Sequence, residues 1–340
     1  MRANPTCRYL ALFVLITAGV TDASLVAAVD SKPLTVLRQA LAVACTATNA
    51  TLDEMAHTMT GAAGVDESTI EFRDNVIGWR RRLVLDNGAE VKVERIAPAG
   101  RLRRLGAQYS APSPHGKRPL LTALAGPRCQ IRFGRRLVYE DGSVAPIALE
   151  HLDGKLAPTG RREPLNPPVP AGRDPGGVLV AIVDAGVNYL LPEIDMRLAR
   201  DRDGKILGYD YWDLDDRPFD ANPARSPFFP QRHGTRTASL LIREAPMIRL
   251  VPYRYPRPDM KRMTDLVHDA ARKGIRIINL SMGSNKLDEW QAFVAAARAR
   301  PEILFVVSAG NNGRDIDAQP VYPAALHLDN IVTVTSSETT

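Results

Sequence analysis

The sequence predicts an α/β fold with a doubly wound, mostly parallel sheet over residues 178–340. Residues 178–183 (Val-Leu-Val-Ala-Ile-Val) form a continuous apolar, β-branched run, which is typical of a strand buried on both faces in a parallel sheet. Further apolar runs alternate with helical patterns along the chain: strands at 248–253, 275–280, 303–307 and 330–334, and helices at 263–273 and 287–299. This alternation favours a doubly wound sheet, in which functional sites gather at the carboxyl ends of the strands.

A separate N-terminal module is predicted over residues 31–156. A helical pattern at 33–44 is followed by alternating apolar segments that contain the turn sequences Asn87-Gly88 and Asp141-Gly142. These features indicate a small β-rich or α+β module with hairpins. Residues 157–177 then carry six prolines and several glycines, so we interpret them as a linker at the domain boundary.

Length and composition allow two folded domains. The chain has 340 residues, 45% of them hydrophobic and 24% charged, which are ordinary globular values and exclude a wholly disordered chain. The net charge of +6 is too small to indicate nucleic-acid binding. Basic clusters at 80–82 and 101–104 lack interleaved aromatic residues, so we interpret them as solvated faces and expect no nucleic-acid partner.

The first 28 residues have the pattern of a secretory signal peptide. Arg2 and Arg8 precede an apolar run over 9–20, and small residues follow it. The chain is therefore expected to be secreted or periplasmic, with no stable membrane insertion after cleavage; the alternative is an uncleaved N-terminal anchor. Cleavage would leave Cys45 and Cys129, which either form a disulfide or remain two buried thiols.

Four polar segments follow or flank the predicted strands of the C-terminal domain. Asp184 ends the first strand, and His233 lies where a loop enters an apolar helix. Small residues at 281–283 would allow an extended peptide to pair with the backbone, and the amide of Asn311 could donate a hydrogen bond to an oxyanion. Taken alone, Asp184 reads as a helix N-cap and His233 as a solvated loop residue.

The order of these segments along the chain is more specific than any one of them. Asp184, His233, the run Asn279-Leu-Ser-Met-Gly283 and Asn311 resemble the subtilisin family of serine endopeptidases over about residues 178–335. The resemblance implies a subtilisin-type fold, incomplete at the C-terminus, that acts on polypeptides. It implies that Asp184 orients the imidazole, His233 acts as general base, and Asn311 stabilises the tetrahedral intermediate. Ser281, Met282 and Gly283 would line the cleft and pair with the substrate backbone.

Two departures accompany this resemblance. Ala185 replaces the Ser or Thr that usually follows the aspartate, and no Gly-Thr-Ser-x-Ala motif for the nucleophile follows Asn311; Ser336 and Ser337 lack its glycine, threonine and helix. We therefore expect an exported endopeptidase sequence that is truncated, as a fragment, a disrupted gene or a boundary error, and nearly inactive as it stands. The alternative is a non-catalytic, peptide-binding pseudoprotease. Residues 31–156 occupy the position of the family's prosegment, although no motif establishes that role.

No cofactor is required by this chemistry, and no metal-ligand residues are predicted. Calcium is conceivable, because subtilisin relatives often carry it, and residues 209–220 gather several carboxylates. Their spacing matches no metal-binding loop. We therefore interpret this stretch as a solvated acidic loop.

Overall fold

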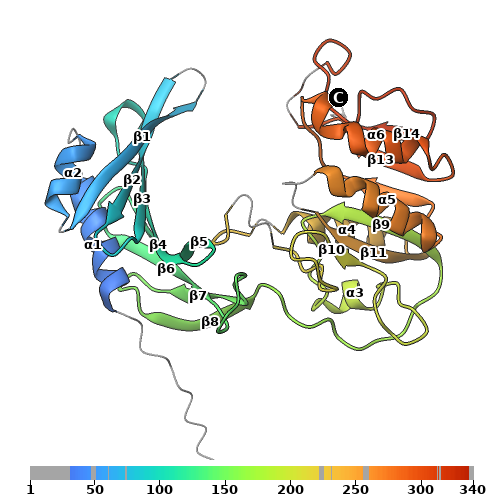
Figure 1. Cartoon of the computed structure of the whole chain (residues 1–340), viewed down its shortest axis with the longest axis horizontal. Helices are drawn as coiled ribbons and strands as arrows, with labels where there is room; N and C mark the ends of the chain where they lie inside the picture. The colour runs from blue at the N-terminus through green and yellow to red at the C-terminus, as the bar shows by residue number, and fades with distance from the viewer. Residues whose placement is uncertain are drawn as a thin grey trace, which may run out of the picture.

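A computed structural model shows two lobes, each built around one sheet (Figure 1). It describes residues 31–46, 51–59, 61–72, 75–221, 226–230, 232–255, 260–311, 313 and 315–336. The predicted signal peptide at 1–28 lies outside the described residues. Within the described part of the chain, no helix is long and apolar enough to cross a membrane.

The N-terminal lobe is an eight-stranded sheet in which every strand pairs antiparallel with the next. Its elements are α1 (Ser31–Thr46), α2 (Leu52–Thr58), β1 (Ala62–Phe72), β2 (Asn75–Leu85), β3 (Glu90–Ile96), the 3-10 turn η1 (Pro98–Gly100), β4 (Arg104–Ser113), β5 (Gly116–Ala125), β6 (Ile131–Val138), β7 (Ala148–Leu152) and β8 (Pro158–Pro164). The module is therefore α+β. Helices α1 and α2 lie on one face of the sheet, where they share its largest apolar cluster.

One predicted hairpin is confirmed and the other is only partly right. The Asn87-Gly88 turn joins β2 to β3: Gly88 has φ +75°, and the Asn87 side chain accepts a hydrogen bond from the Ala89 N–H at 3.0 Å. Around Asp141-Gly142, β6 and β7 do pair antiparallel, but they are joined by a longer loop over 139–147. The alternation past Gly142 fails because Val144 is exposed in that loop.

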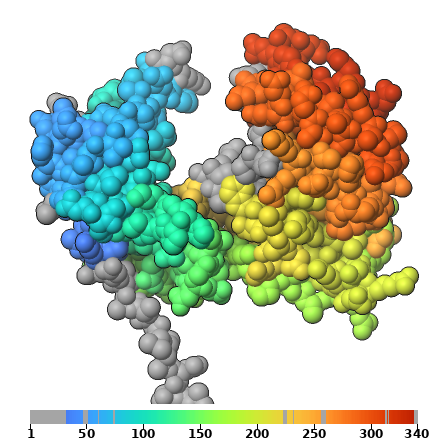
Figure 2. Space-filling view, viewed as in Figure 1, coloured from blue at the N-terminus to red at the C-terminus, as the bar shows by residue number. Residues whose placement is uncertain are grey.

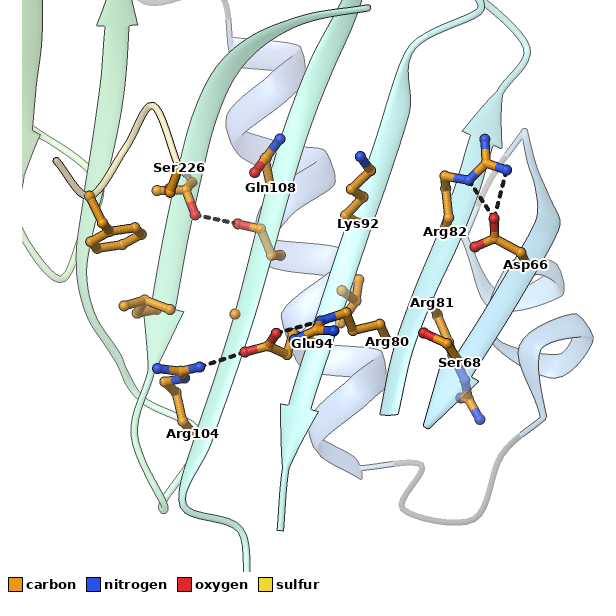
Figure 3. Close-up of a pocket in the computed structure, with 16 residues that line it drawn as sticks. Asp66, Ser68, Arg80, Arg81, Arg82, Lys92, Glu94, Arg104, Gln108 and Ser226 are labelled. Atoms are coloured by element: carbon orange, nitrogen blue, oxygen red, sulfur yellow. Dashed lines mark hydrogen bonds and ion pairs between the residues drawn. The ribbon is translucent and has the colours of Figure 1, made fainter. Parts of the chain in front are cut away.

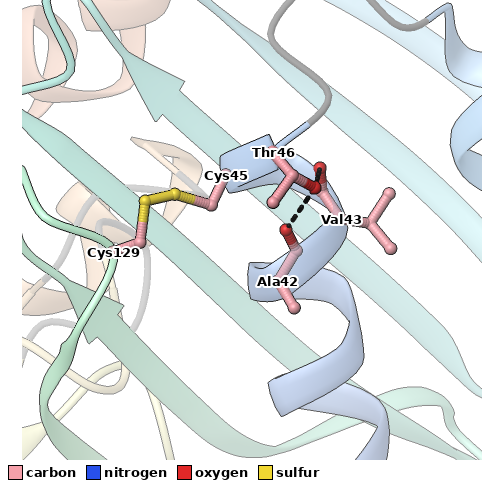
Figure 4. Close-up of a disulfide and its surroundings, with 5 residues drawn as sticks. All are labelled: Ala42, Val43, Cys45, Thr46 and Cys129. Atoms are coloured by element: carbon pink, nitrogen blue, oxygen red, sulfur yellow. Dashed lines mark hydrogen bonds between the residues drawn. A yellow bond between two sulfur atoms is a disulfide. The ribbon is translucent and has the colours of Figure 1, made fainter.

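Cys45 and Cys129 form a disulfide that ties the end of α1 to the turn before β6 (Figure 4). Their Cα atoms are 6.0 Å apart, within the range that a disulfide spans. The bridge links the helical layer to the sheet across a sequence separation of 84 residues.

The expected linker at 157–177 is shorter than its composition indicates. Residues 158–164 form β8, the last strand of the antiparallel sheet, so the connection between the two sheets spans 165–177. Pro158 and Pro164 are the first and last residues of this strand. Proline is tolerated there because an edge strand leaves one row of backbone N–H groups unpaired.

The C-terminal lobe is a six-stranded sheet in the order β10-β11-β9-β12-β13-β14, and all of its strand pairs are parallel. Its elements are β9 (Val178–Asp184), α3 (Pro192–Asp195), β10 (Tyr209–Asp210), α4 (His233–Glu244), β11 (Ile248–Arg254), η2 (Met260–Arg262), α5 (Met263–Arg272), β12 (Ile277–Leu280), η3 (Leu287–Trp290), α6 (Gln291–Arg298), β13 (Leu304–Ser308) and β14 (Ile331–Val334). The predicted parallel sheet is confirmed.

Both faces of this sheet are covered, because β9 contributes alternate residues to two apolar clusters. Ala181 and Val183 pack with residues of α5 and α6, and Val180 and Ile182 pack with residues of α3 and α4. Since side chains alternate along a strand, an all-apolar run is what a two-faced strand requires. The central position of β9 places its carboxyl end, where Asp184 lies, in the middle of the sheet edge.

Candidate active site

Asp184 is held at the carboxyl end of β9 and is only 4% exposed. Its carboxylate Oδ1 accepts a hydrogen bond from the Ala185 N–H at 2.7 Å. Its backbone carbonyl accepts another from the Tyr255 N–H at 2.6 Å, just beyond the neighbouring strand β11. The aspartate is therefore held by backbone N–H groups that directly follow β9 and β11.

His233 is the first residue of α4, and its imidazole contacts this carboxylate directly. Nδ1 lies 2.7 Å from Oδ2 and 2.8 Å from Oδ1 of Asp184. Because an ionised carboxylate can only accept, Nδ1 carries a proton, and in the neutral ring Nε2 is then the basic nitrogen. About half of the imidazole surface is exposed, at 52%, whereas the Asp184 side chain is buried. The pair therefore combines a buried orienting group with an accessible base.

Two glycines allow the helix to approach the strand end this closely. A Cβ on Gly234 would lie 2.0 Å from the carbonyl oxygen of Gly186 and 3.1 Å from the Cβ of Asp184. Gly186 itself has φ +92°, a conformation that L side chains rarely adopt. The glycines in Asp-Ala-Gly and His-Gly-Thr therefore serve the Asp184–His233 contact sterically.

A buried carboxylate, Asp220, supports the first turn of α4. Its Oδ2 accepts hydrogen bonds from the Thr235 N–H at 2.8 Å and from the Thr235 hydroxyl at 2.5 Å. The residue before the helix, Arg232, has φ 53° and makes no side-chain cap of its own. Asp220 therefore satisfies an N-terminal amide that the local sequence does not.

The environment of Asp220 opposes its ionisation. Burial raises the pKa of the Asp220 carboxyl from 3.8 to about 6, and the nearby charge of Asp184 adds to this, against the lowering effect of its bonds to Thr235 and of Arg232. The side chain is fully buried, and its Oδ1 accepts no hydrogen bond among the described residues. A group that titrates near neutrality thus lies directly beneath the histidine helix.

The interpretation of residues 209–220 as a solvated acidic loop is wrong. Asp210 and Asp220 are fully buried, and Arg254 at the end of β11 is 4% exposed. The guanidinium of Arg254 lies 2.5 Å from Asp210 Oδ2 and 2.6 Å from Asp213 Oδ2, and it donates to the Ala221 carbonyl at 2.9 Å. Burial raises the pKa of the Asp210 carboxyl to about 6, although Arg254 counters it.

These buried partners were missed because they are far apart in sequence. Arg254 is separated from Asp210 by 44 residues, and Thr235 from Asp220 by 15. The one available signal was the arginine at the end of an otherwise apolar strand. Among the described residues, no group of three or more His, Cys, Asp or Glu side chains is arranged to hold a metal ion.

The residues expected to bind substrate follow the neighbouring strand β12. Ser281, Met282 and Gly283 are half-buried, and the Ser281 hydroxyl accepts a hydrogen bond from the Asn279 amide at 2.9 Å. The backbone of Ser284, the next residue, is already paired with Tyr322 through two hydrogen bonds of 2.7 and 2.9 Å. A Cβ on Gly283 would lie 2.9 Å from the Tyr322 carbonyl oxygen. This pairing fixes the backbone directly after the segment that is expected to bind substrate.

Asn311 is exposed and follows β13, the strand beyond β12. The sheet therefore brings the three expected segments to one edge, since the carboxyl ends of parallel strands share an edge. Among the candidate residues, the side chains of Asp184 and His233 are in direct hydrogen-bonding contact. Asn311 and the Ser281–Gly283 segment lie on successive strands from them.

The comparisons with known proteins match the C-terminal lobe to one family. Residues 176–340 match the model of the subtilase family. The C-terminal part of this chain belongs to the subtilase family. A thermophilic serine proteinase of Bacillus sp. (strain AK1) is 28% identical over 160 residues, which cover 42% of this chain and 35% of that protein. The chain therefore spans about a third of the length of the curated relative that it matches.

Among solved structures, the crystal structure of a cold-adapted subtilisin-like serine proteinase is similar to part of this chain. The two are 20% identical, and the match covers 48% of this chain and 56% of that chain with a TM-score of 0.30. The family assignment accordingly rests on the match over residues 176–340.

Proposed function

We propose that the subtilase region provides the Asp–His part of the machinery of an exported serine endopeptidase. The observation that carries the proposal is the contact of 2.7 Å between the buried Asp184 carboxylate and Nδ1 of the half-exposed His233. Such a pair fixes the tautomer and orientation of the imidazole and stabilises the imidazolium that forms during proton transfer. An ion pair on the solvent-exposed surface contributes little and holds neither side chain in one orientation.

The roles follow from the positions along the sheet edge. His233 takes a proton from the attacking group and later returns it to the leaving group. Asn311 donates its side-chain N–H to the oxyanion, an interaction worth about 3 to 4 kcal/mol in acyl transfer. Ser281, Met282 and Gly283 bind the polypeptide backbone beside the scissile bond.

The 340-residue polypeptide by itself is expected to cleave peptide bonds at a negligible rate. Residues 312–340 contain no Gly-Thr-Ser-x-Ala sequence, so no side chain in the expected context supplies the attacking oxygen. Removing one member of a triad leaves only the catalysis that the oxyanion hole and binding provide. Peptide hydrolysis by this polypeptide that a serine-directed inhibitor stops would contradict this expectation.

Export is supported by the bridge between Cys45 and Cys129. Disulfides persist in oxidising compartments and are rare in the cytosol. The apolar N-terminal run with its basic flank favours the same route. We propose a secreted or periplasmic location.

An activated ester tests the proposed role of His233 without a serine nucleophile. Water attacks a peptide p-nitrophenyl ester, His233 accepts the proton, and p-nitrophenolate leaves. We expect the 340-residue polypeptide to hydrolyse this ester faster than equimolar imidazole, and His233→Ala to lower the rate about 100-fold, as general base catalysis typically contributes.

The matched control is His327→Ala, because His327 is an exposed histidine in the segment before β14, a strand that β12 and β13 separate from β9. We expect this variant to retain the wild-type rate. Equal rates for both variants would contradict the role of His233. Binding of peptides without any His233-dependent ester hydrolysis would instead favour the pseudoprotease alternative.

A further inference from the structure

The two faces of the N-terminal sheet differ in what covers them. One face packs against α1 and α2 through buried residues such as Leu83, Val91 and Leu105. On the other face, the strands β6 and β7 contact residues 226–229 of the subtilase lobe. Phe228 packs there with Leu137 and Leu149, and the Arg135 guanidinium donates to the Phe228 carbonyl at 2.5 Å.

The remainder of this face, over β1 to β5, borders a cavity of about 760 Å³ (Figure 3). Side chains of the sheet form its floor, and Ser226 and Phe229 of the subtilase lobe contribute to its wall. We call it the open-face cavity. It lies where the surface is hollowed between the two lobes (Figure 2).

The charges that a ligand would meet in the open-face cavity are mainly positive. Five lining residues are cationic and two are anionic: Arg80, Arg81, Arg82, Lys92 and Arg104 against Asp66 and Glu94. Arg80, Lys92 and Arg104 have side chains that are 60%, 58% and 54% exposed, whereas Glu94 is 27% exposed. Asp66 is 61% exposed but pairs with Arg82, and Arg81 is only 6% exposed and pairs with Glu67. The positive charge that a ligand meets is therefore carried mainly by Arg80, Lys92 and Arg104.

Glu94 cannot neutralise both of the arginines that it contacts. Its carboxylate lies 2.8 Å from Arg80 and 2.6 Å from Arg104, as the dashed lines in Figure 3 show. Burial raises the pKa of Glu94, but the two guanidiniums outweigh it and hold the pKa below its usual value. One negative charge between two positive ones leaves a net positive site, and guanidiniums pair well with carboxylates.

The cavity is close to the histidine along the chain. Phe229 in its wall and His233 are four residues apart, so their Cα atoms lie within about 14 Å of each other. An extended polypeptide could therefore contact both places at once. The ligand class follows from this position, since the subtilase site is proposed to act on polypeptides.

We propose that the open-face cavity is an accessory binding site for acidic segments of polypeptide substrates. This inference rests on the proposed function for its choice of a polypeptide. An acidic segment binds across Arg80 and Arg104, and the same polypeptide continues toward His233. The N-terminal module thereby contributes to substrate selection.

The test measures binding to the 340-residue protein by fluorescence anisotropy at low ionic strength. The probes are a labelled peptide with alternating Glu and Ser and its counterpart with Gln in place of Glu. We expect the Glu peptide to bind more tightly, and Arg80→Gln with Arg104→Gln to weaken it about fivefold or more, the effect of one exposed ion pair of about 1 kcal/mol. Arg80→Lys with Arg104→Lys keeps the charge and is expected to retain most of the binding.

The matched control is Arg101→Gln with Arg103→Gln, which removes the same charge from exposed residues of the same module outside the cavity. An equal loss in both double variants would overturn the site, because it would reflect net charge alone. Tighter binding of an oligonucleotide of equal charge, lost in the Arg80/Arg104 variant, would overturn the choice of a polypeptide.

The test also separates this site from the proposed function, since binding is measured without turnover. Loss of selective peptide binding together with intact His233-dependent ester hydrolysis contradicts the accessory site alone. Selective peptide binding without that hydrolysis contradicts the proposed catalysis, and it leaves the open-face cavity as a binding site for acidic peptides.

Discussion

The charged residues around the open-face cavity and those beneath the candidate active site differ in their burial. In the N-terminal sheet, arginines and lysines such as Arg80, Arg104 and Lys92 lie on an exposed face and pair with neighbouring carboxylates. In the subtilase lobe, Asp184, Asp210, Asp220 and Arg254 are 4% exposed or less. Burying a charge costs far more than pairing it at a surface, so the second arrangement persists only where the groups are held by specific partners.

The buried charged groups lie around the contact between Asp184 and His233. The buried groups converge on the end of β9 and the first turn of α4: Arg254 holds the loop over residues 210–221, and Asp220 at the end of that loop holds Thr235. They thereby fix the backbone around Asp184 and His233. The exposed ion pairs of Arg80 and Arg104 with Glu94 lie on the surface of the other lobe, where a ligand can reach them.

The largest effect is expected for Arg254→Met. It removes the cation between Asp210 and Asp213 and leaves a buried carboxylate without its partner, which typically costs about 3 to 5 kcal/mol. Urea unfolding at neutral pH measures this loss. A decrease in the free energy of unfolding of less than about 1 kcal/mol, the value for a surface ion pair, would contradict the distinction between buried and exposed charges.

Removal of the disulfide is expected to act on the N-terminal lobe alone. Cys45→Ser with Cys129→Ser releases a sequence separation of 84 residues in the unfolded chain, for which a loss of about 2 to 4 kcal/mol is typical. Hydrogen exchange of β3 to β5 should accelerate, and that of β9 and β12 should not. Equal acceleration in both sheets would show that the lobes unfold as one unit.

Asp220→Asn is expected to change how stability depends on pH. The folded pKa of about 6 lies above 3.8, so the favourable contribution of the neutral carboxyl is present at low pH and is lost as the pH rises through about 6. Between pH 4 and 7 the wild type should therefore lose up to about 3 kcal/mol relative to this variant.

Urea unfolding across this pH range checks the expectation. Asp216→Asn is the control, because Asp216 lies on the same loop with a side chain that is 52% exposed. The comparison removes the same charge at an exposed and at a buried position of one loop. A difference from the wild type that does not change with pH for Asp220→Asn would show that Asp220 is not held in the environment described.

The smallest effect is expected for Arg80→Met. Its side chain is 60% exposed, and exposed ion pairs contribute about 1 kcal/mol or less. The unfolding free energy should hardly change, while binding of acidic peptides weakens. A stability loss like that of Arg254→Met would mean that the exposed pairs are structural after all.

Local sequence patterns predicted much of the subtilase lobe. The apolar run at 178–183, the helix that ends at Gly274 and the strand at 303–307 correspond to β9, α5 and β13. Gly274 has φ +75°, the conformation of a helix C-cap glycine. Each of these signals lies within a few residues of the structure that it predicts, which is why periodicity and turn chemistry sufficed.

What could not be predicted depended on contacts between distant residues. The carboxylates at 209–220 read as solvated because their partners, Arg254 and Thr235, are elsewhere in the chain. Strand β8 was hidden by its prolines, which an edge position tolerates. The open-face cavity is likewise lined by residues of both lobes, so no single segment of the sequence predicts it.

A double-mutant cycle tests most directly whether Asp184 and His233 work as one unit. Hydrolysis of the peptide p-nitrophenyl ester is measured for the 340-residue protein, for Asp184→Asn, for His233→Ala and for the variant with both changes. Groups that act together are strongly non-additive, so we expect the double variant to be no slower than His233→Ala alone. Independent, multiplying losses from the two changes would contradict the proposed Asp–His catalytic pair.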